Sequence, residues 1–298
     1  PSSAASDVYK RQNPPQPRQQ WCSDGFKAIA YAPSNPSIVY AGMRASRRNI
    51  DGGFPARPSY GMYKSTDGGE TWQAINNGLN TALINIHTIA VHPTDPNTVY
   101  IGTWKDGVFK TTDGGQNWVA KNNGLTSADV RALAIDPQNP NIIYAGLGEG
   151  KGIFKSTDSG EHWTMVNTGL SLDCPPYLLP IGQVQQNLTL EPEAPPVLPQ
   201  GLSYASVSWT SIWDIVIDPT DSQIIYAADH HGGVYLSTNG GTSWAPINDG
   251  LTMKAVTALS ISSDGEVVYA ATWGGGVFRL GEVTMHNIYL PLVMKSYP

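Results

Sequence analysis

The eight residues STDGGETW (Ser65 to Trp72) return three times along the chain with small changes. The later copies are TTDGGQNW (Thr111 to Trp118), STDSGEHW (Ser156 to Trp163) and STNGGTSW (Ser237 to Trp244). Their final tryptophans are 46, 45 and 81 residues apart, so the last interval holds one repeat and about 36 further residues. Self-similarity at a fixed period of this length is typical of solenoids and propellers.

Each copy lies within a longer unit of about 45 residues. Two apolar segments joined by a Pro-rich turn, as in IAVHPTDPNTVYIG, come before a short third segment such as GVFKT, and the Trp opens a fourth. Four short strands per unit, separated by Gly and Pro turns, predict a propeller blade. Five such units begin near the following residues: Phe26, Ile86, Val130, Ile212 and Val256.

The fifth unit has only three strands and ends near Leu280. We therefore predict an all-β fold, a single β-propeller of five four-stranded blades. A strand from the N-terminus, which carries Trp21, would close the last blade and remove an exposed sheet edge. A six-bladed ring with residues 171–211 as a degenerate blade is the alternative.

The predicted organisation has three parts. Residues 1–18 are polar and Pro-rich, and we expect a disordered lead. Residues 19–282 form the propeller, and a long insertion between blades at 171–211 contains seven prolines. Residues 283–298 form an apolar tail that packs along the propeller, or serves as a docking tail or a strand donated to a neighbouring molecule.

Composition excludes several classes of protein. The 298 residues carry a net charge of −6, which disfavours nucleic-acid binding, and no apolar run is long enough to span a membrane. Cys22 and Cys174 are the only cysteines, too few for a disulfide framework or a metal cluster. We hypothesise that they form one bridge that ties the insertion across the propeller mouth. No cofactor is expected.

The repeated eight-residue motif has a local structural explanation. Its Asp accepts hydrogen bonds from backbone N–H groups further along the turn, its Gly tolerates positive φ, and its Trp packs the turn onto the blade. Each turn has too few carboxylates for a calcium site. The residues assigned to this structural role are Asp67, Trp72, Asp113, Trp118, Asp158, Trp163, Asn239 and Trp244.

The pattern S-x-D-x-G-x-x-W resembles the Asp-box of sialidase-like (BNR-repeat) and sortilin-like β-propellers, and the resemblance covers roughly residues 21–282. It implies that the boxes lie on the face away from the ligand. The loops between the second and third strands, and those between blades, would then form the ligand face. Aromatic and polar side chains gather in these loops, as expected of a glycan or peptide site, and Arg suits an anionic group. The candidate ligand-binding residues are Arg44, Arg47, Arg48, Trp104, Glu149, His230, His231 and Trp273.

The enzymatic alternative lacks a pattern of its own. The resemblance implies that a sialidase would draw an arginine cluster from several blades and carry an Arg-Ile-Pro signature, whereas the arginines clustered here belong to one loop. No catalytic residue and no metal ligand is therefore assigned. We predict a secreted or cell-surface binding or scaffold propeller for a glycan or protein segment. A glycoside hydrolase, and a structural subunit that self-assembles through its tail into an oligomer or fibre, are the alternatives.

Overall fold

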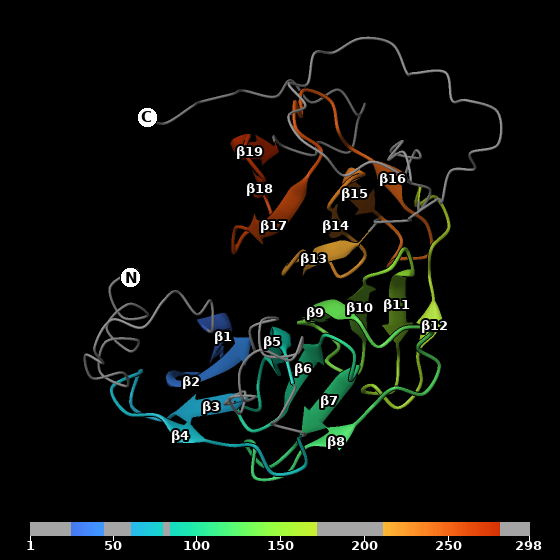
Figure 1. Ribbon diagram of the computed structural model, residues 1–298. Helices are drawn as coiled ribbons and strands as arrows, with labels where there is room; N and C mark the ends of the chain where they lie inside the picture. The colour runs from blue at the N-terminus through green and yellow to red at the C-terminus, as the bar shows by residue number, and fades with distance from the viewer. Residues whose placement is uncertain (1–24, 45–60, 80–83, 172–210, 281–298) are drawn as a thin grey trace, which may run out of the picture.

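The computed structural model describes residues 25–44, 61–79, 84–171 and 211–280, and all regular secondary structure within them is β-strand (Figure 1). Nineteen strands form five antiparallel sheets, which are the blades. In every blade the strands are ordered as they occur in the sequence, so each strand pairs with the next one along the chain. No helix that could span a membrane occurs in this described part.

The blades share one strand plan, and the first two strands are longest in blade 1. Blade 1 contains β1 (Gly25–Ala32), β2 (Asn35–Arg44), β3 (Met62–Ser65) and β4 (Gln73–Ala74). Blade 2 contains β5 (Ile86–Val91), β6 (Val99–Thr103), β7 (Val108–Thr111) and β8 (Val119–Ala120). Blade 3 contains β9 (Val130–Ile135), β10 (Ile143–Leu147), β11 (Gly152–Ser156) and β12 (Thr164–Met165). Blade 4 contains β13 (Ile212–Ile217), β14 (Ile225–Asp229), β15 (Gly233–Ser237) and β16 (Ala245–Pro246). Blade 5 contains β17 (Val256–Ile261), β18 (Val268–Thr272) and β19 (Gly276–Leu280).

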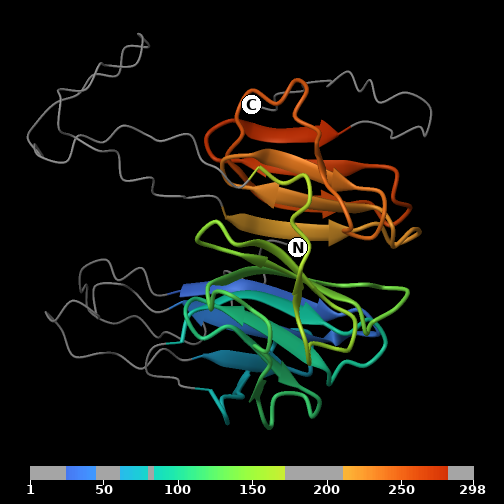
Figure 2. The same ribbon diagram turned by 90° about the vertical axis from the view of Figure 1, so that its right-hand side faces the viewer.

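The first strand of each blade is the innermost. β1, β5, β9, β13 and β17 face a common centre, and the later strands of each blade lie progressively further out (Figure 1). Each inner strand packs against the inner strand of the next blade, from β1 through to β17. Seen from the side, blades 4 and 5 (orange and red) lie above blades 1 to 3 (Figure 2). In the described residues β17 and β1 do not pack together in this way.

Side chains repeated in every blade build the joints between blades. The tyrosine of the second strand is buried in blades 1 to 4, and three of these hydroxyls donate to a backbone carbonyl of the following blade: Tyr40 to Pro96, Tyr100 to Ser159 and Tyr144 to Gly240. Gly42, two residues further along β2, has no room for a side chain, because a Cβ there would collide with the side chain of Ile86 in the next blade. Glycine at this position therefore lets the next blade pack closely.

The structure confirms the predicted all-β propeller of five blades, which begin where the repeat placed them. In the described residues the fifth blade has three strands. The predicted N-terminal closing strand, the lead at 1–18, all but the two end residues of the 171–211 insertion and all of the 283–298 tail lie outside the described residues.

Candidate functional site

A β-bulge lies near the start of every inner strand. Each bulge skips one residue in the pairing with the second strand: for example, Phe26 pairs with Met43 and Ala28 with Gly42, so that the register passes over Lys27. The skipped residues of the five blades are Lys27, His87, Arg131, Trp213 and Thr257. Bulges re-aim side chains and are frequent beside functional sites.

The bulge side chains of separate blades meet at the centre of the ring. The ammonium of Lys27, in blade 1, lies 5.8 Å from the centre of the Trp213 ring in blade 4. The guanidinium of Arg131, in blade 3, lies 5.4 Å from the same ring. Because β1 and β13 belong to blades that are not neighbours, these distances show that the side chains converge at the axis. We call this end of the ring the axial mouth.

The aromatic part of the mouth is a cluster of four rings. His230 stacks on Trp213 with ring centres 4.8 Å apart, and it meets His231 and Trp273 edge-on at 4.5 and 6.0 Å. Burial, followed by the charges of His231 and Arg131, lowers the pKa of His230. His230 is therefore a neutral ring at neutral pH. Trp273 is 66% exposed to solvent.

Backbone hydrogen bonds hold the aromatic loop residues beside the bulges. The N–H groups of Trp104, His230 and Trp273 each donate to the carbonyl of the residue that precedes the inner strand of the same blade: Asn85, Ser211 and Ala255. These three aromatics occupy the same position, directly after the second strand of their blades. The fold therefore places them around the mouth independently of what their side chains contact.

Two buried carboxylates, Asp129 and Asp229, lie at the mouth. Asp129 accepts hydrogen bonds at Oδ2 from Nε and Nη2 of Arg131, at 2.9 and 2.7 Å, and its Oδ1 lies 3.8 Å from Nδ1 of His87. Asp229 accepts at Oδ1 from the backbone N–H groups of His231 and Gly232. Burial raises the pKa of Asp229 above its ordinary value.

Several buried polar atoms of the mouth have no hydrogen-bond partner. They come from the bulge residues, from residues next to the inner strands and from the end of β14: Asn85 Oδ1, Asp129 Oδ1, Trp213 Nε1, Asp229 Oδ2 and His230 Nε2. A buried polar atom that has lost water without gaining a partner is costly, so such groups call for an explanation. Among the described residues these atoms are concentrated at the mouth end of the ring.

The predicted site residues fall into three groups. Trp104, His230, His231 and Trp273 lie at the mouth, as described above. Glu149 is an exposed loop residue on the same face, with φ 58°. Its Oε2 accepts a hydrogen bond from Ser127. Arg44 ends β2 but its side chain is not described, and Arg47, Arg48, Cys22 and Cys174 lie outside the described residues.

Sequence reasoning missed the bulge residues and the carboxylates beside them. A signal for the bulges was available, because aligning the five units puts Lys27, His87, Arg131, Trp213 and Thr257 in one column. The residue type in that column differs from blade to blade, whereas the residue just before it is apolar in all five units. Asp129 has no such signal, since only the tertiary structure shows that it pairs with Arg131 at the mouth.

The opposite end of the blades carries the repeated motif. In the first box the hydroxyl of Ser65 donates to Asp67, and Asp67 accepts from the backbone N–H of Thr71, four residues on. These bonds hold the pKa of Asp67 far below its ordinary value, and they hold those of Asp113 and Asp158 at about 2. In the fourth box Asn239 makes the equivalent contacts with Ser237 and Ser243.

Three box tryptophans connect neighbouring blades. The indole N–H groups of Trp118, Trp163 and Trp244 donate to carbonyls just beyond the outer strand of the preceding blade: Ile75, Lys121 and Val166. Trp72, in the first blade, instead donates to Gly69 within its own turn. The boxes therefore hold the ring together.

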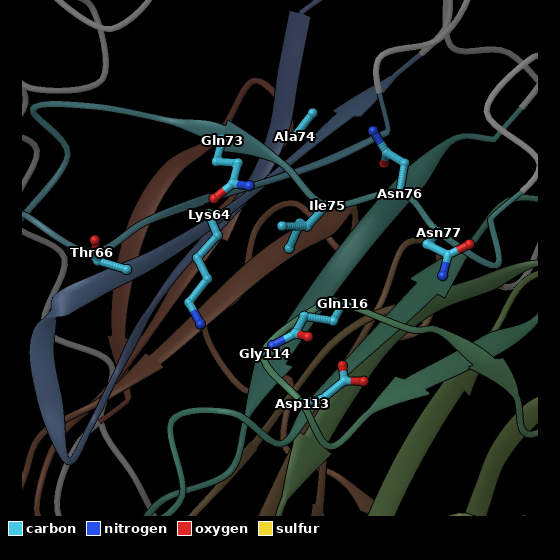
Figure 3. Close-up of a pocket in the computed structure, with 11 residues that line it drawn as sticks. Lys64, Thr66, Gln73, Ala74, Ile75, Asn76, Asn77, Asp113, Gly114 and Gln116 are labelled. Carbon is cyan, nitrogen blue, oxygen red and sulfur yellow. The ribbon is translucent and has the colours of Figure 1, made fainter.

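A cavity of about 350 Å³ opens at one such joint, between blades 1 and 2 (Figure 3). Lys64 and Asp113 line it together with the residues after β4. Lys64 lies over the Tyr40 ring, as Lys110 and Lys155 lie over Tyr100 and Tyr144 at the next two joints. Because the same lysine–tyrosine pairs recur at the next two joints, we assign this hollow to blade packing. In the described part of the chain, no group of three or more His, Cys, Asp or Glu residues is arranged to hold a metal ion.

Comparisons with known proteins agree with this architecture. The family model for sortilin (Sortilin-Vps10; sortilin, neurotensin receptor 3) matches residues 60–174, which contain the first three boxes. Two solved structures of GH74 enzymes, one ancestral and one from Niastella koreensis, align with 90% of the chain at TM-scores of 0.59 and 0.58 and identities of 21% and 18%. Residues 60–174 are thus similar to the sortilin family, and the chain as a whole is a five-bladed β-propeller.

This propeller also matches a curated relative, the dispase autolysis-inducing protein of Streptomyces mobaraensis. The two are 29% identical over 128 residues, which are 41% of the propeller chain and 33% of the relative. The aligned regions cover 31% and 36% of the two GH74 chains. The chain thus spans about a third of the length of these proteins.

Proposed function

We propose that this propeller is a binding module that acts outside the cytoplasm and takes up a glycan in its axial mouth. The observation that carries the proposal is the set of unpartnered buried polar atoms grouped around the Trp213, His230 and Trp273 rings. A family model named for a receptor is consistent with a binding role.

The chemistry of the mouth suits a sugar. Asn85, Asp129 and Asp229 offer acceptor oxygens, and Trp213 offers an indole donor, so that a ligand needs several donors and an acceptor in a small space. Sugar hydroxyls provide both. The C–H face of a sugar ring packs on an exposed indole such as that of Trp273, while the polar groups fix its orientation.

A glycan array followed by calorimetry with the purified protein tests the proposal. We expect one class of glycan to bind, and Trp273→Ala to weaken that binding about 10-fold or more through the lost ring contact. Trp72→Ala is the matched control, because it removes the same side chain at the box end and leaves the affinity unchanged. If no glycan binds, the proposal fails and a protein segment becomes the ligand to seek.

A glycoside hydrolase is the second candidate, favoured by Asp229. Its raised pKa and its unpartnered Oδ2 are properties of a general acid, and Asp129 provides a second carboxylate on the same face. Incubation of any bound glycan with the protein, followed by assay of new reducing ends, separates the two functions. Turnover that Asp229→Asn abolishes while binding persists would favour the hydrolase.

A further inference from the structure

Each of blades 1 to 4 packs one face against the following blade. In blade 5 the same face is uncovered in the described residues. The second-strand tyrosine is at most 3% exposed in the first four blades, whereas Tyr269 is 45% exposed. The first apolar residue of the third strand is fully buried as Met62, Val108, Ile153 and Val234, whereas its counterpart Val277 is 63% exposed.

Blade 1 leaves the complementary face uncovered. The apolar residues of the inner strand that pack against a preceding blade are buried or half-buried in blades 2 to 5, as Ile215 and Ile217 are in blade 4. Their counterparts Ile29 and Tyr31 are 60% and 61% exposed. Two apolar faces that belong to one joint therefore both lack a covering partner in the described residues.

In the complete joints this space is filled by two residues that follow the outer strand. They occur ten and fourteen positions after the last residue of the third strand, as Ile75 and Leu79 follow Ser65. Ile75 and Leu79 belong to one cluster with Met62 of their own blade and Ile89 and Val91 of the next. Val166 with Leu170, and Ile247 with Leu251, occupy the same positions in blades 3 and 4.

The residues beyond β19 continue this register. Ten and fourteen positions after Leu280 stand Leu290 and Met294, and the position of the two-residue outer strand falls on Ile288 and Tyr289. All four are apolar or aromatic. We propose that residues 288–294 of this chain form the outer strand of blade 5 and fill the joint with blade 1, with Leu290 and Met294 covering Val277, Ile29 and Tyr31.

The N-terminal segment fits the same joint less well. Trp118 and Trp244 each precede the first buried residue of the next inner strand by 12 positions, whereas Trp21 precedes Phe26 by five. The positions that would hold the outer strand are Pro15 and Gln16, whereas the first outer-strand residue of every described four-stranded blade has an N–H; proline occurs only in the second position, as Pro246. The C-terminal residues have the further advantage of being tethered beside the edge they would cover.

The tail lacks three features that follow the third strand in the other blades: the box, an asparagine and a glycine. The residues after β19 contain no box, and Pro291 replaces the asparagine whose side chain accepts from the third-strand N–H, as Asn248 accepts from Val234. Val293 replaces the glycine that has positive φ in the other units, as in Gly250. The tail therefore lacks the residues that form the turn to a following blade in the other units. We expect it to end the series of blades by pairing with β19.

Hydrogen exchange of the full chain, read by mass spectrometry, tests the proposal directly. We expect slow exchange in peptides that cover residues 286–294, at all protein concentrations. Slow exchange in residues 13–24 with fast exchange in 286–294 would overturn it in favour of N-terminal closure. Protection of 286–294 that is lost on dilution would overturn it in favour of a strand donated to a second copy.

A double-mutant cycle between Ile29→Ser and Leu290→Ser tests the contact itself. Each change alone is expected to lower Tm by roughly 5 °C, because it exposes apolar surface at the joint, and the pair together should lower it by little more than either alone. Val119→Ser is the control, since Val119 is 56% exposed on an outer strand and its replacement leaves Tm nearly unchanged. Two single changes without effect would overturn the proposal.

Discussion

The two ends of the blades follow opposite rules. At the box end the same residues return in each blade that carries a box, and they make the same bonds: a hydroxyl to a carboxylate or amide, a backbone N–H four residues on, and an indole N–H to a carbonyl. At the mouth end the bulge position holds a different side chain in each blade, and buried polar atoms there lack partners. Repetition thus accompanies the bonds that join the blades, and variation accompanies the side chains that converge at the mouth.

The largest expected effect concerns a box tryptophan within a joint. Trp163 is buried and donates to Lys121 in the preceding blade, so Trp163→Ala should lower the free energy of unfolding by about 3–5 kcal/mol. Trp72 bonds only its own turn, and Trp72→Ala should cost about 1 kcal/mol. Urea denaturation measures both changes. Equal losses of unfolding free energy would contradict the distinction between a tryptophan that joins two blades and one that bonds within its own turn.

The next largest effect concerns the ion pairs at the two ends of the blades, Arg131–Asp129 at the mouth and Lys121–Glu161 at the box end. Arg131→Met leaves the carboxylate of Asp129 buried without its main partner, and should cost about 3 kcal/mol. Lys121→Met at the box end breaks a pair with the exposed Glu161 and should cost less than about 1 kcal/mol. Urea denaturation at pH 7 distinguishes them, and a larger loss in the Lys121 variant would reverse our assignment.

The dependence of stability on pH should have opposite signs for the two ends. Burial raises the pKa of Asp214, next to the Trp213 bulge, to about 6, so the folded state holds its proton more tightly than the unfolded state. Its contribution is therefore greatest below pH 4 and falls by roughly 3 kcal/mol as pH rises through 6. Asp113 and Asp158 have lowered pKa values, and their contribution is present above pH 4 and lost as pH falls toward 2.

Asp214→Asn separates the two windows. The variant should lose most of the decline in stability between pH 4 and 6, the remainder coming from Asp229, whose pKa burial also raises, while it keeps the decline below pH 4. Denaturation midpoints measured from pH 2.5 to 8 provide the comparison. A decline between pH 4 and 6 that persists in full in the variant would assign that titration to another group.

The smallest expected effect tests whether boxes are interchangeable. Ser159 has φ 60° where the other boxes have glycine, such as Gly68 with φ 74°. Ser159→Gly should raise the free energy of unfolding by about 0.5 kcal/mol, and Gly68→Ser should lower it by a similar amount. Thermal unfolding of both variants measures the pair, and changes of the same sign would show that local context outweighs the backbone preference.

Prediction from sequence succeeded where the chain repeats itself. Alternating apolar residues, the turns and the box at a period of about 45 residues are local features, and they located five blades and their first residues. Three of the predicted mouth residues, Trp104, His230 and Trp273, could be placed because they follow the second strand in every blade where they occur. The four-ring cluster could not be predicted, since it joins residues from β13 and from two loops.

The sequence by itself determined the blade, because strand period, glycine turns and box hydrogen bonds involve residues close together in the chain. Only the tertiary structure decided the site. A β-bulge is a matter of pairing register, and contacts such as Lys27 with Trp213 depend on how three joints orient four blades around one axis. It also exposed the asymmetry between blades 1 and 5, because a face is uncovered only in relation to the neighbour that would pack on it.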